Sequence, residues 1–157
     1  MSEQELVSHG HDELDYNYIT DGIYIGNNQC CQLRFSDELI AQGINTDISF
    51  EEERMDAPFG VSYYVWIPVK NFEAPTMEQL EFAVSIMEKN VMMKKKIYAH
   101  CQKGHGRAPT FVAAYLINGG KTFEEAELFI KQRRPSIHIE DVQKAVLREF
   151  AESLLQR

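Results

Sequence analysis

The stretch that decides the fold is AHCQKGHGRAPT, residues 99–110. The segment before it, Ile97 to Ala99, has the β-branched and aromatic character of a strand, and Thr110 to Asn118 has the apolar pattern of a helix. We therefore predict a strand that turns directly into a helix. Backbone N–H groups converge in such a turn at the positive end of the helix dipole. The stretch thus predicts a small anion-binding loop.

A nucleophile stands in this loop. Cys101 lies at its start and Arg107 at its end, so the guanidinium can close over an anion that the cysteine faces. Gly104 and Gly106 let the backbone curl with its amides inward. The same positive field favours the thiolate of Cys101, which is the nucleophilic form. The predicted donors to the anion are the residues from Cys101 onward: Gln102, Lys103, Gly104, His105, Gly106 and Arg107.

The motif His-Cys-x5-Arg, here HCQKGHGR at residues 100–107, resembles the signature of the cysteine-dependent protein tyrosine phosphatases, and the small size favours their dual-specificity branch. ITDGIYIGN at 19–27, IPV and AP between 67 and 75, and RPSI at 134–137 also match stretches of small dual-specificity phosphatases. The resemblance covers about residues 19–150. A lone Cys-x5-Arg is a weak signal; the preceding histidine, both glycines and the strand and helix context make it specific.

The resemblance implies hydrolysis of phosphate monoesters through a cysteinyl-phosphate. In that mechanism Cys101 attacks the phosphorus, the loop amides and Arg107 hold the phosphate oxygens, and His100 orients the loop through hydrogen bonds. It implies no metal and no cofactor. The implied substrates are phosphorylated proteins, with phosphotyrosine foremost, or small aryl phosphates.

The elements around the loop predict an α/β fold. We expect a hairpin at 16–25, a short helix at 36–43, strands at 44–49 and 61–69, and helices at 76–91, 110–118, 122–133 and 139–155. Thr76 with Gln79 and Thr122 with Glu125 make capping boxes at two of these helices. Alternating strands and helices predict a mostly parallel sheet with helices on both faces. The 61–69 strand is rich in β-branched and aromatic residues, so we expect it to be central, with Trp66 in the core.

The length and the net charge of the chain limit its possible functions. The 157 residues suit one domain, 16–157, after a mobile N-terminus of residues 1–15. The net charge of −8 argues against nucleic-acid or anionic-membrane partners. No apolar run is long enough to span a bilayer and no signal peptide is visible, so we expect a cytoplasmic protein. His9 and His11 of the terminus are expected to be solvated rather than metal ligands.

Two positions depart from the family pattern. Ala108 stands where a Ser or Thr commonly assists the thiolate leaving group, and Asn71 stands where relatives carry the general acid. Glu73 in the same loop is the candidate replacement; the other options are Asp56 or a carboxylate of Glu51–Glu53, or no acid at all. Because aryl esters have a good leaving group, loss of the acid predicts a preference for them over alkyl esters.

Charged residues near these motifs allow two interpretations each. Residues 51–54, Glu-Glu-Glu-Arg, are expected to form a solvated loop; alternatively they border the site and hold the phosphate-binding arginine. Lys103 and His105 add positive charge at the rim, and alternatively read an acidic neighbour of the phosphate, as in relatives that accept phosphoinositides.

Two other functions compete with a phosphatase. A phosphotyrosine-binding pseudophosphatase would keep the anion loop and lose turnover, as Asn71 and Ala108 suggest. A cysteine-based arsenate reductase or redox protein would need a second thiol, and only the adjacent Cys30 and Cys31 are present, without the spacing of a redox pair. These two cysteines make no disulfide framework.

Overall fold

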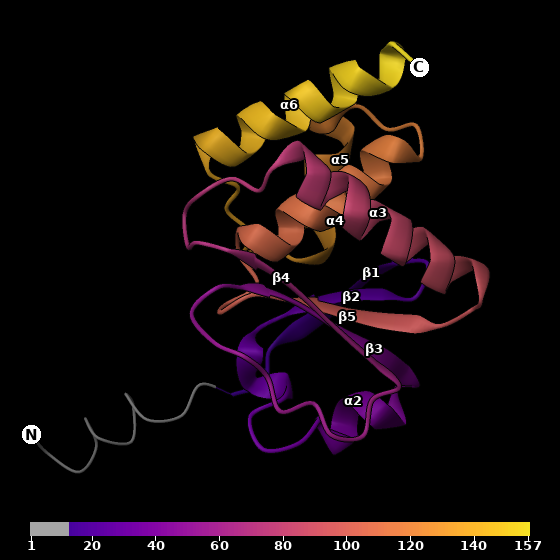
Figure 1. The fold of residues 1–157 in the computed structure, drawn as a ribbon, viewed down its shortest axis with the longest axis vertical. Helices are drawn as coiled ribbons and strands as arrows, with labels where there is room; N and C mark the ends of the chain where they lie inside the picture. Colours follow the sequence, from indigo (N-terminus) through magenta and orange to yellow (C-terminus); the bar gives the residue numbers. More distant parts are fainter. Residues whose placement is uncertain (1–12) are drawn as a thin grey trace, which may run out of the picture.

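A computed structural model describes residues 13–157 and shows a five-stranded sheet between two unequal helical layers (Figure 1). The strand order is β1-β2-β5-β3-β4. The strands are β1 (Tyr16–Thr20), β2 (Ile23–Gly26), β3 (Ile44–Glu51), β4 (Tyr63–Val69) and β5 (Lys96–His100). β1 and β2 form an antiparallel hairpin, and every other neighbouring pair is parallel. The predicted α/β fold with a mostly parallel sheet is confirmed.

Helices lie on both faces of the sheet, as expected, but their distribution is uneven (Figure 1). One face carries α3, α4 and α5, with α6 packed outside on α4; within residues 13–157, the other face carries α2 and the 3-10 turn η1. Their bounds are η1 (Asn28–Cys30), α2 (Asp37–Ala41), α3 (Met77–Met92), α4 (Arg107–Asn118), α5 (Phe123–Arg133) and α6 (Asp141–Leu155). The α2 face has a small core of its own: Tyr24, Cys30, Cys31, Phe35, Leu39, Ile44 and Tyr98.

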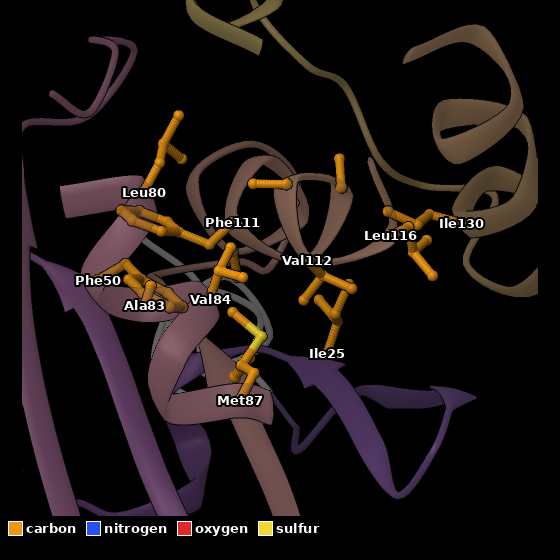
Figure 2. Close-up of a cluster of buried hydrophobic side chains, with 14 of the residues drawn as sticks. Ile25, Phe50, Leu80, Ala83, Val84, Met87, Phe111, Val112, Leu116 and Ile130 are labelled. Carbon is orange, nitrogen blue, oxygen red and sulfur yellow. The ribbon is translucent and has the colours of Figure 1, made fainter. Parts of the chain in front are cut away.

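The main core lies between the sheet and helices α3 and α4 (Figure 2). Phe50 of β3 stacks on Phe111 of α4 with ring centroids 3.9 Å apart, and both side chains are fully buried. Most of α4 is buried, so it is fixed from several sides. This places the start of α4, where the signature arginine stands, on a rigid support.

Helix α4 begins at Arg107, three residues before the predicted start at Thr110. Pro109 is tolerated in the first turn because an N–H at that position has no partner within the helix. Both predicted capping boxes, at the starts of α3 and α5, are confirmed.

The 61–69 segment forms an edge strand, so its prediction as a central strand is wrong. Trp66 is 38% exposed rather than in the core, and its indole Nε1 donates to the carbonyl oxygen of Glu51 at 2.8 Å. β-branched and aromatic residues fit any pleated, half-buried surface, and they do not encode a strand's place in the sheet. Pro68 suits an edge, where a missing N–H donor costs less.

Residues 13–15, the described end of the N-terminal segment, contact the rest of the domain. Asn27 donates to the carbonyl of Glu13 at 2.7 Å, and Asp15 pairs with Arg134 at 3.0 Å. His9 and His11 lie outside the described residues. Within 13–157, none of the helices combines the length and the apolar character needed to cross a membrane.

Candidate active site

The signature loop connects β5 to α4 at the carboxyl end of the parallel strands. It lines a cavity of about 330 Å³, into which Cys101 and Arg107 both face, although each is almost fully buried. The loop residues on the cavity wall are Cys101, Gln102, Lys103, His105, Gly106 and Arg107. The structure therefore brings the predicted nucleophile and the predicted anion-binding residues, apart from Gly104, to one cavity.

Gly104 faces away from the cavity and packs on β2. Its φ of +73° lies in the left-handed region, and a Cβ at this position would stand 2.5 Å from the carbonyl oxygen of Gly26. Only glycine fits so close to a neighbouring backbone. Gly104 thus shapes the loop without lining the cavity.

Arg134 clamps the loop from outside, a role that the sequence did not reveal. This fully buried arginine follows α5, and its guanidinium donates to the carbonyls of Gly104 and Lys103, each at 2.9 Å. The rest of the fork reaches Asn17 at 2.8 Å and Asp15 at 3.0 Å. Because the two loop carbonyls are turned outward to Arg134, they are kept away from a bound anion. Arg134 begins the RPSI stretch, which the sequence analysis matched to the family without assigning it a role.

Glu53 orients the guanidinium of Arg107, which lines the cavity. Its two carboxylate oxygens accept from the guanidinium at 2.6 and 2.8 Å, and the carbonyl of Val69 accepts at 2.8 Å. The hydrogen bonds from Arg107 lower the pKa of Glu53 below its ordinary value. The acidic cluster therefore borders the site, and its interpretation as a purely solvated loop is wrong. Glu51, at the end of β3, is fully buried.

The loop after β4 forms another wall of the cavity. Asn71 and Phe72 line it, and Phe72 has a positive φ of 67°, which is uncommon for a residue other than glycine. Glu73 is not among the lining residues; its carbonyl accepts from the side chain of Gln143 at 3.0 Å. The sequence analysis did not identify Phe72 as a site residue.

The segment between α5 and α6 and the first turn of α6 complete the cavity, and the sequence analysis missed them. His138, Glu140 and Gln143 line the wall, and Gln143 is buried. Among the described lining residues, Glu140 carries the single carboxylate. At the rim, burial lowers the pKa of His105, assisted by the charges of Arg134 and Lys103. This shift favours the neutral form of His105.

His100 lies behind the loop, fully buried. Its Nδ1 is 3.3 Å from the carbonyl oxygen of Cys101, and its Nε2 is 2.8 Å from Asp56 and 3.0 Å from Asp47. Burial alone would lower the pKa of His100, but the two carboxylates raise it well above its ordinary value. Burial also raises the pKa of Asp47 to about 7. Asp56 is thus occupied behind the loop, not in the cavity as a replacement acid.

Cys30 and Cys31 lie close to His100, behind the signature loop. Their sulfurs are bonded to each other, so the bond links neighbours and ties no distant segments together. Cys101 is the free cysteine of the described residues.

Comparison with known proteins agrees with this geometry. The model of the family described as "Polymorphic toxin system, DSP-PTPase phosphatase" matches residues 28–121. The human protein "Phosphatidylglycerophosphatase and protein-tyrosine phosphatase 1" is 38% identical over 84 residues, which are 53% of this chain and 42% of that protein. "Protein-tyrosine-phosphatase IBR5" of Arabidopsis thaliana is 31% identical over 77 residues, 48% of this chain and 30% of that protein. The chain therefore matches less than half the length of these relatives.

Solved structures share the fold over nearly the whole chain. A mouse putative dual specificity phosphatase complexed with zinc tungstate superposes with a TM-score of 0.82 at 19% identity, covering 94% of this chain and 95% of the other. PTPMT1 in complex with PI(5)P superposes with a TM-score of 0.77 at 25% identity, covering 90% and 97%.

Proposed function

The chain belongs to the DSP-PTPase phosphatase family, and on this premise we propose that it hydrolyses phosphate monoesters at Cys101, with aryl esters such as protein phosphotyrosine preferred. One observation carries the proposal: Cys101 and Arg107 line one cavity, and Glu53 and Val69 already hold the guanidinium there. A pre-oriented donor needs no reorganisation when charge develops on the phosphate. We place the activity in the cytoplasm, where a catalytic thiol stays reduced.

The reaction has two steps. The sulfur of Cys101 attacks phosphorus, the bond from phosphorus to the ester oxygen breaks, and the phenolate or alkoxide leaves and takes up a proton from solvent. Water then attacks the cysteinyl-phosphate, which releases inorganic phosphate and restores the thiolate. Loop amides and Arg107 bind the three non-bridging oxygens in both steps. Ala108 offers no hydroxyl to the leaving thiolate, so we expect the second step to be slow.

The acid position explains the proposed substrate preference. The amide of Asn71 cannot donate a proton to the leaving oxygen at neutral pH. A phenolate leaves readily without a proton, whereas an alkoxide does not. The carboxylate of Glu53 is paired with Arg107. Glu73 and Glu140 are therefore the candidate acids, and of the two Glu140 lines the cavity.

A second candidate substrate is the phosphate of a lipid headgroup. Two relatives, the human phosphatidylglycerophosphatase and protein-tyrosine phosphatase 1 and the PTPMT1 complex with PI(5)P, carry lipid substrates or ligands in their names. Lys103 at the rim would meet a second negative group of such a headgroup. This ester is alkyl, however, so the missing acid at Asn71 opposes it.

Steady-state turnover tests the proposal, with Cys101→Ser as the blank. The substrates are an aryl phosphate, a phosphotyrosine peptide, and phosphatidylglycerophosphate in vesicles. We expect the two aryl esters to have the higher kcat/KM. A higher value on the lipid would favour the second candidate. A stoichiometric burst of the phenol without further turnover would favour the phosphotyrosine-binding pseudophosphatase, and the absence of both burst and turnover would contradict the role of Cys101.

A further inference from the structure

A cluster of five potential metal ligands lies behind the signature loop, outside the cavity. It consists of Cys30, Cys31, Asp47, Asp56 and His100, and one ligand atom from each lies within 4.8 Å of all the others. Four separate segments supply them: the chain around η1, strand β3, the loop after β3, and the end of β5. The side chains of Asp47, Asp56 and His100 are all fully buried. The phosphatase chemistry proposed above does not use the carboxylates or the two sulfurs.

The hydrogen bonds around His100 leave its partners unsatisfied. Nδ1 lies beside the carbonyl of Cys101 at 3.3 Å, so a proton on Nδ1 is donated there. Nε2 then faces three acceptors: Asp56 Oδ2 at 2.8 Å, Asp47 Oδ1 at 3.0 Å and Cys31 Sγ at 3.6 Å. One ring nitrogen carries at most one proton and cannot serve all three.

The two carboxylates find little compensation elsewhere. Both oxygens of Asp47 and Oδ1 of Asp56 are buried without a hydrogen bond. The guanidinium of Arg54 lies 3.5 Å from Asp56 and also 3.5 Å from Glu51, so its charge is shared. Buried charges of one sign are costly unless a cation or a proton neutralises them. A cation at the centre of this group would lie close to one ligand atom of each of the five residues.

We propose that the reduced protein binds one zinc-class divalent ion through Cys31, Asp47, Asp56 and His100. Thiolate, imidazole and carboxylate are the ligands that Zn²⁺ takes in tetrahedral sites. Bonds of about 2.0–2.3 Å imply ligand-to-ligand edges of roughly 3.3–3.7 Å. The observed separation of 3.6 Å from sulfur to nitrogen fits, and the separations from Nε2 to the carboxylates need to open by a few tenths of an ångström.

The surroundings of His100 match those of a metal ligand. A histidine that binds metal through one ring nitrogen commonly donates the other N–H to a backbone carbonyl. Nδ1 of His100 faces the carbonyl of Cys101, which leaves Nε2 for the ion. The ion would therefore fix the imidazole against the residue that carries the nucleophile, and its place is structural rather than catalytic.

Binding depends on the redox state of the adjacent cysteines. While Cys30 and Cys31 are bonded to each other, no thiolate is available. A dithiol reductant supplies two electrons and two protons, is itself oxidised to a disulfide, and leaves two free thiols. The thiol of Cys31 then loses its proton to solvent when the ion binds. Cys31 is the sulfur ligand because its Sγ lies 3.6 Å from Nε2 of His100.

Cobalt is the probe for the test, because tetrahedral Co²⁺ absorbs in the visible and shows a near-ultraviolet charge-transfer band when a thiolate binds it. The full chain, reduced with a phosphine, is titrated with Co²⁺ and then with Zn²⁺. We expect both absorptions at one ion per chain, their loss on adding Zn²⁺, and neither absorption in the oxidised protein. Absence of the charge-transfer band in the reduced protein would overturn the proposal.

Variants of the ligands locate the site. Cys31→Ser should abolish the charge-transfer band, and Asp47→Asn should weaken cobalt binding by more than the 10- to 100-fold that is typical of losing an outer hydrogen-bond partner. Cys30→Ala frees Cys31 permanently, so it should bind cobalt with or without the reductant. Circular dichroism confirms that each variant is folded. If Asp47→Asn fails to fold, Cys30→Ala provides the test instead. If Cys30→Ala still needs the reductant to bind cobalt, the proposal is contradicted.

Two controls exclude other sites. Cys101→Ser removes the catalytic thiol and should leave the band unchanged, as should the double variant His9→Ala/His11→Ala. Loss of the band in either control would assign the ion to the cavity or to the N-terminus and would refute the site behind the loop. Zn²⁺ should also raise the thermal midpoint of the reduced wild type but not of Cys31→Ser.

Discussion

Glu53 holds Arg107 through two hydrogen bonds, of 2.6 and 2.8 Å, across 54 positions of sequence. The fork-to-fork geometry fixes the plane of the guanidinium before a substrate arrives. Val69 fixes the same group from a third direction at 2.8 Å. Arg107, the proposed phosphate-binding arginine, is therefore oriented by the loop after β3 and the end of β4.

Glu53→Gln should lower kcat/KM on an aryl phosphate about tenfold. The amide loses one of the two charge-assisted hydrogen bonds, worth about 1.5 kcal/mol, and such a loss corresponds to roughly tenfold in rate. The exposed neighbour Glu52 provides the control, since Glu52→Gln touches no described site residue. Equal effects of the two substitutions would show that Glu53 does not position Arg107.

The same pair should make stability depend on acid pH. Arg107 lowers the pKa of Glu53 below 4.5, so the unfolded state binds more protons. The stabilisation is complete above 4.5 and is lost as the pH falls through the folded-state pKa. Urea unfolding at several acid pH values should show a smaller loss in Glu53→Gln than in the wild type. If the unfolding free energy falls with pH to the same extent in both proteins, the pair of Glu53 and Arg107 adds nothing to stability.

Asn71→Asp should restore a general acid. General acid catalysis is worth about 10²- to 10⁴-fold, so turnover of an alkyl phosphate should rise far more than that of an aryl phosphate. If every rate is unchanged, Asn71 is not the acid position.

The remaining carboxylates are tested in the wild-type background. Glu140→Gln should lower alkyl turnover more than Glu73→Gln, because Glu140 lines the cavity and Glu73 does not. The reverse order would assign the proton to Glu73.

Gly104→Ala should destabilise the protein and reduce activity together, because a Cβ there meets the backbone of Gly26 at 2.5 Å. We expect a loss of about 3 kcal/mol or more, from strain at positive φ plus the forced shift. Gly120→Ala is the matched control: its φ of +113° is also positive, but no atom lies within 4 Å of the added Cβ. Chemical unfolding measures the stability of each variant, and kcat/KM measures its activity. Similar losses in the two variants would exclude the contact with Gly26 as the cause.

Arg134→Met should release the signature loop. It leaves the carbonyls of Lys103 and Gly104 without their buried donor, and an unsatisfied buried acceptor costs about 1–3 kcal/mol. We expect weaker inhibition by inorganic phosphate as well as lower unfolding free energy. The exposed Lys131→Met serves as the control. Unchanged phosphate inhibition in a folded Arg134→Met would contradict the clamp.

Prediction from the sequence worked best where one continuous segment carries the information. The turn from β5 into α4 and the capping boxes of α3 and α5 depend on residues a few positions apart. It failed for β4, whose composition suits a strand but does not say that it lies at the edge. It also missed Phe72, whose positive φ no sequence pattern announces.

The sequence by itself determined the loop from β5 into α4, with Cys101 and Arg107 at its two ends, because their spacing and the strand-to-helix turn are local. Only the tertiary structure decided which residues support that loop: Glu53 on Arg107, Arg134 on the loop carbonyls, and the carboxylates and sulfurs that surround His100. These contacts join distant segments through the strand order. That order follows from burying the whole sheet, and no single stretch of the chain encodes it.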